Sequence, residues 1–431
     1  MAKLVSNWAG NQVFAPRRIA TPASEDELAQ VVADAAKQNL RVRVVGANHS
    51  WSPVVATEDV LVSLDRLDQV LATEGRRVTV QGGIRLGALN LRLAERGLAM
   101  PNLGSIDRQS IAGAISTATH GSGCTHGVLS TTVSELRLMG PDGQVQALSA
   151  EHRPELFDAA RAGLGLFGII TAVTLDCEPA FRLREHTVPM RFDQVVADLD
   201  ALIHGAEYPR LWWLPHTEVV QLFSIDRSED PSTTIGAMEW LNERVLNPVF
   251  FPLILKLGAA VPALIPVLNR IIARSYFADR IRVGQSHRVL HVPEPPRHLE
   301  AEYAIGLERL GEALPGLRRI IDEGDLKVNF VQEIRFVKAD RLPLSPAYGR
   351  ETAYVAAYSA NPRHMDRFLR AFEAMMEDLE GRPHWGKLFN RSPEQLRALY
   401  PEWDRVMALR QEVDPEGRFL NPFTQRVLGL A

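Results

Sequence analysis

The stretch from Pro101 to Gly127, PNLGSIDRQSIAGAISTATHGSGCTHG, is the sequence feature that most restricts the fold. It is crowded with glycine, alanine, serine and threonine, so it cannot fill a hydrophobic core with bulky side chains. It can instead bring many backbone N–H groups and hydroxyls against the phosphates and ring edges of a ligand. A tight connector rich in turns is the alternative, but the length of the run favours contact with a ligand.

A second candidate segment is RVRVVGANHSW, which begins at Arg41. Valines on both sides of Arg43 predict a buried strand. The chain breaks at Gly46, and His49 follows at once. The pattern therefore predicts an imidazole presented where a strand ends.

Residues 163–168, GLGLFG, match the G-x-G-x-x-G pattern of nicotinamide dehydrogenases. That fingerprint needs a strand before it and a helix after it, so that the helix N-terminus faces the pyrophosphate. Here a predicted helix precedes the glycines and a predicted strand follows them. An NAD enzyme is therefore the weaker interpretation, and the glycines more simply allow a close approach of the backbone.

Length and composition limit the class of protein. The 431 residues exceed one ordinary core, and 46% hydrophobic with 23% charged residues is typical of a soluble globular protein. A net charge of −4 with no basic stripe argues against nucleic acid as a partner. Cys124 and Cys177 cannot form a disulfide framework, so we expect a reducing cytoplasm.

The residue pattern predicts an α+β protein. The first part alternates helices and strands: a capped helix begins at Ser24, and a Pro-Asp-Gly turn joins the two strands of a hairpin. From residue 181 the sequence predicts long antiparallel strands and a sheet that roofs a site on the first domain. DPEGRFLNPFTQRVLG, near the end, resembles a loop. We expect these domains: 1–180, 181–415, and a segment 416–431 that returns to the first domain.

Residues 247–269, NPVFFPLILKLGAAVPALIPVLN, are nearly long enough to span a bilayer. Lys256 and three prolines, Pro252, Pro262 and Pro266, interrupt them. We expect short apolar helices packed on the protein, with contact to a membrane surface as the alternative.

His120, Cys124 and His126 suggest a metal site by their spacing. A zinc site usually needs a fourth ligand, and no further cluster of ligand residues stands out in the sequence. The residues around these three suit an anion or a ring better than a cation. We therefore expect no metal.

Three of these segments, in this order, are similar to a known family: GANHSW, then GSI and SIAGAISTATHGSG, then GLGLFGIITAVTL. Together they resemble the FAD-linked oxidases of the vanillyl-alcohol-oxidase fold, which have a two-subdomain PCMH-type FAD-binding domain and a cap with a large antiparallel sheet. NWAGNQ, EYAIG, RPHWGK and DPEGRFLNPF are similar to the aldonolactone oxidases within that family. The resemblance extends over nearly the whole chain.

The resemblance implies that His49 is bonded covalently to the 8α-methyl of FAD, which raises the reduction potential of the flavin. A hydrogen-bonded core histidine is the alternative. It also implies that the dinucleotide is lined by Gly46, Ala47, Asn48, Ser50, Gly104, Ser105, Gly113, Ser116, Thr119, His120, Gly121, Gly163, Gly168 and Ile169. Glycine at position 104, beside the flavin edge, implies that oxygen can approach.

Glu333 and Arg335, in VQEIRFV, project from the same face of a predicted strand. A surface ion pair is the ordinary explanation of such a pair. The resemblance instead places it over the flavin, where it holds the hydroxyls of the substrate. By the same resemblance Lys387 is a third charge near the ring, and Ser105 completes the polar wall.

The implied reaction is oxidation of a sugar 1,4-lactone, L-gulono-1,4-lactone or a similar aldonolactone, at C2. Hydride passes to flavin N5, and O2 reoxidises the flavin to give H2O2 and an ascorbate-type product. Ala356 and Tyr358 stand where alditol-oxidising relatives have histidine and threonine, which favours a lactone. A dehydrogenase with a quinone or cytochrome acceptor, an alditol or sugar oxidase, and a flavin-carrying protein without turnover remain alternatives. The oligomeric state stays open.

Overall fold

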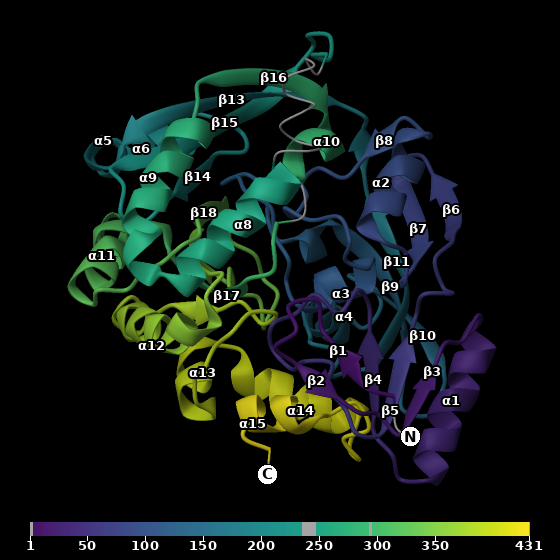
Figure 1. Cartoon of the computed structure of the whole chain (residues 1–431). Helices are drawn as coiled ribbons and strands as arrows, with labels where there is room; N and C mark the ends of the chain where they lie inside the picture. Colours follow the sequence, from purple (N-terminus) through teal and green to yellow (C-terminus); the bar gives the residue numbers. More distant parts are fainter. Residues whose placement is uncertain (1–2, 235–246, 293–294, 431) are drawn as a thin grey trace.

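The computed structural model describes residues 3–234, 247–292 and 295–430 (Figure 1). Two smaller sheets and their helices occupy the right of that view, and one large sheet occupies the left and the top. The mixed helix and strand content and the large antiparallel sheet confirm the predicted α+β class. The boundaries at residues 180 and 415 stay predictions.

The His49 loop follows directly after a strand of a three-stranded parallel sheet. Its order is β3 (Arg18–Ala20), β5 (Val60–Ser63) and β4 (Val42–Val45). Helix α1 (Glu25–Lys37) packs its apolar stripe against this sheet, and its N-cap Ser24 accepts a hydrogen bond from the Glu27 N–H, as predicted. The Glu27 carboxylate accepts from the Ala23 N–H rather than from Ser24, so the capping box is shifted by one residue.

A five-stranded antiparallel sheet packs beside it. Its strand order is β10 (Val145–Ser149), β9 (Val133–Met139), β11 (Ile169–Asp176), β7 (Arg77–Gln81) and β6 (Val70–Glu74). The helices of this part are α2 (Leu86–Ala94), α3 (Ile111–Ser116) and α4 (Pro154–Arg161), with the 3-10 turn η1 (Leu129–Thr132). Two short pairs complete it: β1 (Val5–Ser6) with β2 (Val13–Phe14), and β8 (Leu98–Ala99) with β12 (Glu178–Pro179). The predicted hairpin is confirmed as β9–β10.

An eight-stranded antiparallel sheet forms the rest of the core. Its strand order is β16 (Arg280–Gln285), β13 (Arg182–Arg191), β15 (Val219–Ser228), β14 (Arg210–Trp213), β18 (Gln332–Val337), β19 (Thr352–Ser359), β17 (Leu299–Gly306) and β20 (Arg382–Pro383). Side chains alternate between its two faces. Ile334, Val355 and Tyr303 belong to the main hydrophobic core, into which α11 (Leu310–Glu323) and α12 (Pro362–Asp378) pack. The opposite face is therefore free to line a site.

The remaining helices lie around this sheet and at the lower edge of the molecule (Figure 1). They are α5 (Phe192–Ala197), α6 (Leu199–His204), α8 (Asn247–Ala260), η3 (Pro262–Leu264), α9 (Ile265–Tyr276), α10 (Ser286–Leu290), η4 (Leu307–Arg309), α13 (Pro393–Leu399), α14 (Trp403–Val413) and α15 (Pro422–Leu428). The predicted apolar helices of 247–269 are confirmed as α8 and α9. Pro252 lies inside α8 instead of interrupting it, and the helical pair bends by 120° around Val261. No single helix among the described residues has the length and apolar character to cross a membrane.

The prediction of a loop near the C-terminal end was wrong in part, because Pro422–Leu428 form α15. Its signals were present in the sequence: Asn421 caps the helix by accepting from the Thr424 N–H, Pro422 starts it, and Gly429 ends it at φ 66°. The preceding residues contact the first part of the chain. The Arg418 guanidinium donates to the Leu40 carbonyl, and the Asn421 amide donates to the Pro53, Val54 and Ala56 carbonyls.

Arg43, on β4, joins three distant segments by hydrogen bonds. Its guanidinium donates to the carbonyls of Val54, Leu164 and Phe419, and the side chain is buried. Burial lowers the pKa of Arg43 to about 10, so it remains charged at neutral pH.

We expect Arg43→Met to lower the free energy of unfolding by about 3 kcal/mol or more, because it leaves buried carbonyls without a donor. Urea denaturation followed by circular dichroism measures the loss. Arg18→Met is the control, since Arg18 is exposed and its ion pair with Asp34 is 3.9 Å long; it should change stability by less than ~0.5 kcal/mol. Equal effects of the two substitutions would contradict the role given to Arg43.

Candidate active site

A cavity of about 860 Å³ lies between the His49 loop, the small-residue segment and one face of the eight-stranded sheet. Its volume is in the range of cofactor and ligand pockets. Val42, Leu64 and Phe419 line one part of it with apolar side chains, and Glu333 and Arg335 line another part with charges. The cavity thus offers different chemistry to the different parts of an elongated ligand.

The loop after β4 is held in place from both sides. Gly46 packs so closely that a Cβ there would lie 2.1 Å from Ser110 Oγ. Asn48 takes a positive φ of 57°, and its carbonyl accepts from the Trp8 N–H. The half-buried His49 ring stacks on the Trp8 ring, with centroids 5.3 Å apart. The NWAGNQ segment, residues 7–12, thus holds the histidine loop through Trp8.

Most of the residues expected to line a dinucleotide do lie on the cavity wall. They are Gly46, Ala47, Asn48, His49, Ser50, Gly104, Ser105, Gly113, Ser116, Thr119, His120 and Gly168.

Gly121, Gly163 and Ile169 do not lie on that wall. A Cβ on Gly121 would meet Asn102 Oδ1 at 2.2 Å, and one on Gly163 would meet the Ala159 carbonyl at 2.4 Å, so both glycines serve packing within the protein. Ile169 points into the core beneath α1. Two neighbours, Gly165 and Ile170, line the cavity instead.

Acidic and basic side chains alternate across the cavity face of the large sheet. The antiparallel register places Arg210 opposite Arg335 and Trp212 opposite Glu333, so that these residues share a face. We call the following set the charged row: Arg282, Glu185, Arg210, Glu333, Arg335 and Glu302. In that order, the distances between neighbouring nitrogen and oxygen atoms are 2.6, 3.7, 3.8, 3.3 and 2.9 Å.

The pair Glu333 and Arg335 is buried within this row, so it is not the surface ion pair that was the alternative. Trp212 Nε1 donates to Glu333 Oε1 at 2.9 Å, and the Tyr358 hydroxyl donates to Oε2 at 3.1 Å. Burial alone would raise the pKa of Glu333, but Arg335 and Arg210 outweigh it and lower that pKa. Arg335 also donates to Ser105 Oγ at 3.4 Å, which connects the predicted polar residues.

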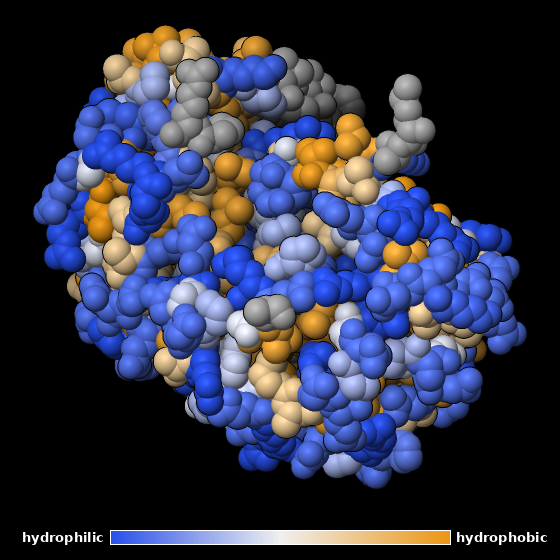
Figure 2. Space-filling view, turned by 90° about the horizontal axis from the view of Figure 1, so that it is seen from below, coloured by the Kyte–Doolittle hydropathy of each residue, from blue (hydrophilic) through white to orange (hydrophobic). Residues whose placement is uncertain are grey.

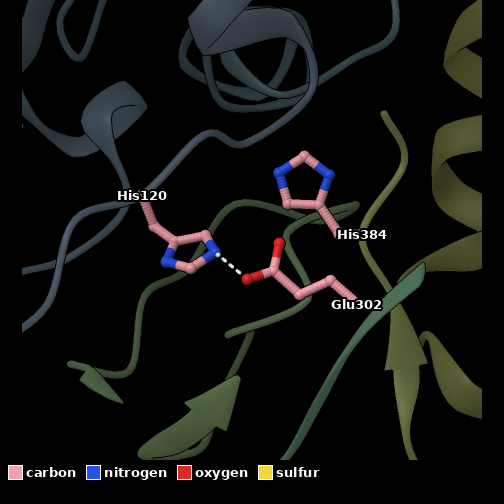
Figure 3. A group of neighbouring side chains, drawn as sticks. All are labelled: His120, Glu302 and His384. Carbon is pink, nitrogen blue, oxygen red and sulfur yellow. Dashed lines mark ion pairs between the residues drawn. The ribbon is translucent and has the colours of Figure 1, made fainter. Parts of the chain in front are cut away.

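Glu302 lies between two imidazoles (Figure 3). His120 Nε2 is 3.4 Å from its carboxylate, and the His384 ring approaches from a different segment. Burial opposes the ionised form of Glu302, but Arg335 and His120 hold its pKa well below the usual range. Burial, followed by the charge of Arg335, lowers the pKa of His120, and burial lowers that of His384 to about 3. The His384 ring is therefore neutral near pH 7.

The spacing of His120, Glu302 and His384 would also suit a metal ion. However, Arg335 already donates to the Glu302 carboxylate at 2.9 Å, and its fixed positive charge opposes a second cation there. The group considered from the sequence is dispersed, because His126 bonds Glu207 at 3.1 Å and does not line the cavity. That the protein holds no metal stays a prediction.

Lys387 lines the cavity, as expected, but it is paired. Its ammonium forms an ion pair with Glu300 and lies 4.2 Å from the Trp51 ring centroid. Burial would raise the pKa of Glu300, but Lys387 and the neighbouring His298, whose Nε2 is 3.7 Å from the carboxylate, lower it. Lys387 therefore brings a neutralised pair to the cavity rather than an isolated charge.

Sequence reasoning missed Glu300, Glu302, Arg210 and His384 as site residues. The first two had a usable signal. In LEAEYAIG they alternate with apolar residues on a strand, as Glu333 and Arg335 do, and acids at such positions are buried only when they are paired. Arg210 and His384 lie in segments whose partners are distant in sequence, and no local pattern shows them.

Comparison with known proteins identifies the fold and the family. Residues 16–149 match a family described as FAD binding domain, and residues 173–427 match the D-arabinono-1,4-lactone oxidase family. The chain belongs to the D-arabinono-1,4-lactone oxidase family. This confirms the predicted family, and the protein is an FAD-dependent oxidoreductase that acts on CH–OH groups.

Three relatives match this chain over nearly their whole length. L-gulono-1,4-lactone dehydrogenase of Mycobacterium tuberculosis (strain H37Rv) is 37% identical and covers 100% of both chains. L-gulonolactone oxidase of Bos taurus is 32% identical over 98% of this chain and 97% of its own. Alditol oxidase of a Streptomyces species is 32% identical over 99% of this chain and 100% of its own. The cholesterol oxidase structure from B. sterolicum has the same fold, with a TM-score of 0.84 at 18% identity, covering 99% of this chain and 97% of that one.

The residues of this oxidoreductase fit FAD. Glycines let the backbone approach a ligand, and the cavity joins an apolar part to a charged part. Asn48 Oδ1, on the cavity wall, is buried without a hydrogen-bond partner among the described residues, so it can meet a polar atom of a bound group. Gly46 to Ser50, Gly104, Gly113 and Thr119 are the residues that would hold it.

The buried His384 should make the folded protein less stable as the pH falls. Burial lowers the pKa of His384 from the ordinary 6.5 to about 3, so below pH 6.5 the unfolded chain binds a proton that the folded chain does not. Unfolding therefore becomes easier as the pH falls from 7 to 4, by up to about 1.4 kcal/mol per pH unit. We expect His384→Gln to flatten this slope in urea titrations, whereas His152→Gln, at an exposed position, should leave it unchanged. Parallel slopes for His384→Gln and the parent protein would contradict the assignment.

Proposed function

We propose that the protein oxidises an aldono-1,4-lactone, such as L-gulono-1,4-lactone, at C2, with FAD bonded to His49 and O2 as the acceptor. One observation carries the proposal: the buried Glu333 and Arg335 face the same cavity as the His49 loop and the small-residue segment. Charged groups that could bind a polyhydroxy substrate thus lie across from residues that could hold a flavin.

When bound, FAD supplies the hydride acceptor and passes the electrons on to oxygen, which yields H2O2. The protein orients the substrate. Glu333 carries a negative charge and accepts a hydrogen bond from the hydroxyl that loses its proton, and Arg335 stabilises the developing alkoxide. Since its neighbours lower the pKa of Glu333, this carboxylate is a weak base, and its main part is to orient the hydroxyl and the water that removes the proton. The 2-keto lactone would then enolise to an ascorbate-type product.

Residues at the end of the cavity support a lactone ring over an open-chain alditol. Tyr358 fills the space beside Glu333 and packs against Phe330, with ring centroids 5.6 Å apart. Ala356 is buried in the same cluster and does not line the cavity, so no side-chain hydrogen bond reaches a substrate from this position. Such a site suits a compact ring. The alditol oxidase relative makes oxidation of an open-chain polyol the second candidate.

Gly104 supports oxygen as the acceptor. A Cβ at this position would lie 3.1 Å from Thr119 Cγ2 and 3.4 Å from the His120 carbonyl, so glycine keeps a narrow space open on the cavity wall. One relative is named a dehydrogenase and another an oxidase. Oxygen uptake with L-gulono-1,4-lactone, compared with reduction of a quinone or cytochrome c without oxygen, tests the acceptor. Turnover only with the second type of acceptor would overturn this part.

We expect Glu333→Gln to slow reduction of the bound flavin by roughly 10²–10⁴-fold, because the variant loses the charge that orients the reacting hydroxyl. Anaerobic stopped-flow spectroscopy with the lactone measures this step separately from reoxidation. Glu373→Gln is the control. Glu373 is also a buried acid, but it accepts a hydrogen bond from the Tyr303 hydroxyl and does not line the cavity. A Glu333→Gln variant that binds the lactone more weakly but reduces its flavin at the normal rate would contradict the role.

Acid precipitation tests the tether to His49. We expect the yellow colour to remain in the pellet of the native protein and to map to the peptide that contains His49. The colour should move to the supernatant for His49→Ala, while His152→Ala should retain it in the pellet. A colourless native pellet would remove the covalent bond from the proposal and leave FAD binding intact.

A further inference from the structure

An exposed apolar surface lies on the pair of helices α8 and α9. Its residues, which we call the α8–α9 apolar face, are Phe250, Leu253, Leu257, Val261, Leu264, Val267 and Ile271. On each helix they recur at intervals of three and four residues, so they form one stripe per helix. Their exposed fractions run from 39% to 56%, whereas most large apolar residues of the chain are buried. Single exposed apolar residues are ordinary, but a continuous set marks an interaction surface.

The opposite faces of the same helices are already occupied. Leu255 is buried against Phe330, and Ile272 against Leu214. Phe251 and Tyr276 line the cavity. A membrane-spanning arrangement would have to pull these inner faces off the protein, and the 120° bend also opposes it. The pair can therefore lie on a surface but cannot cross it.

The charges near the α8–α9 apolar face indicate what kind of partner surface it can bind. Between residues 247 and 278 the chain has Lys256, Arg270 and Arg274 but no aspartate or glutamate, although the whole protein carries a net charge of −4. All three cations are exposed, and none forms an ion pair within the part of the chain that the structure describes. Hydrophilic residues predominate on the underside of the molecule, and the hydrophobic residues visible there gather mainly in the upper part of the view (Figure 2).

We propose that the α8–α9 apolar face docks on the surface of a bilayer that contains anionic phospholipids. The apolar stripes would enter the boundary between headgroups and acyl chains, and the cations would neutralise the headgroups. A second copy of this chain fits less well, because a two-fold contact would bring the three cations close to their own equivalents. Docking would also place the cavity next to the membrane, since the inner sides of both helices line it.

Co-sedimentation of the FAD-loaded enzyme with vesicles tests the proposal. We expect binding to phosphatidylcholine vesicles with roughly a third phosphatidylglycerol, weaker binding to phosphatidylcholine alone, and release of part of the protein by high salt. The variant Leu253→Gln/Leu257→Gln/Ile271→Gln should bind at least ~10-fold more weakly, because its apolar contact is lost. Lys256→Gln/Arg270→Gln should abolish the preference for anionic vesicles.

The control is Leu71→Gln/Leu91→Gln, which removes exposed apolar side chains of similar exposure elsewhere and should bind as the native protein does. Turnover in solution should be unchanged in all these variants, which shows that they fold. Absence of binding to anionic vesicles, or equal binding by the triple variant, would overturn the proposal. A dimer in sedimentation velocity that the triple variant converts to monomer, without vesicle binding, would assign the face to a second copy and also overturn it.

Discussion

The site depends on burying opposite charges side by side on one face of a sheet. An isolated charge in such a place would be expensive to desolvate, so each carboxylate or guanidinium needs a neighbour of opposite sign. The charged row meets this need by strand register: Arg210, Glu333 and Arg335 come from adjacent strands whose alternation brings them to the same face. The other face of the same strands supplies the hydrophobic core. One alternation of side chains thus produces both the stability of the sheet and its polar cavity wall.

Much of the fold follows from local patterns in the sequence. The capped helix at Ser24, the β9–β10 hairpin and the strand that leads to His49 all carried signals within a few residues of each other. The helix at Pro422 also carried such signals, but the loop-forming residues around it concealed them. Strand order could not be predicted in this way, because β18 pairs with β14 and β19 through register that depends on the whole sheet.

The candidate site was predictable where its residues sit close together in sequence. Glu333 with Arg335, and the segment around Gly104, were identified from spacing and resemblance together. The pairing of Lys387 with Glu300 was not, because it joins residues from different segments and depends on how the sheet folds. The displacement of Gly121, Gly163 and Ile169 from the cavity wall has a similar cause. Each lies within a residue or two of a lining position, and only the path of the backbone determines which side chain or Cα faces inward.

The hydrogen bonds of Arg43 have a consequence for biosynthesis. The strand that leads to His49 is fixed by the Phe419 carbonyl, which is 376 residues further along the chain. While a ribosome is still producing the central sheet, this carbonyl does not yet exist, and the histidine loop lacks one of its supports. Cofactor acquisition that depends on an ordered loop must therefore follow translation of residue 419. The proposed attachment of the flavin to His49 would then be a late step in the maturation of the protein.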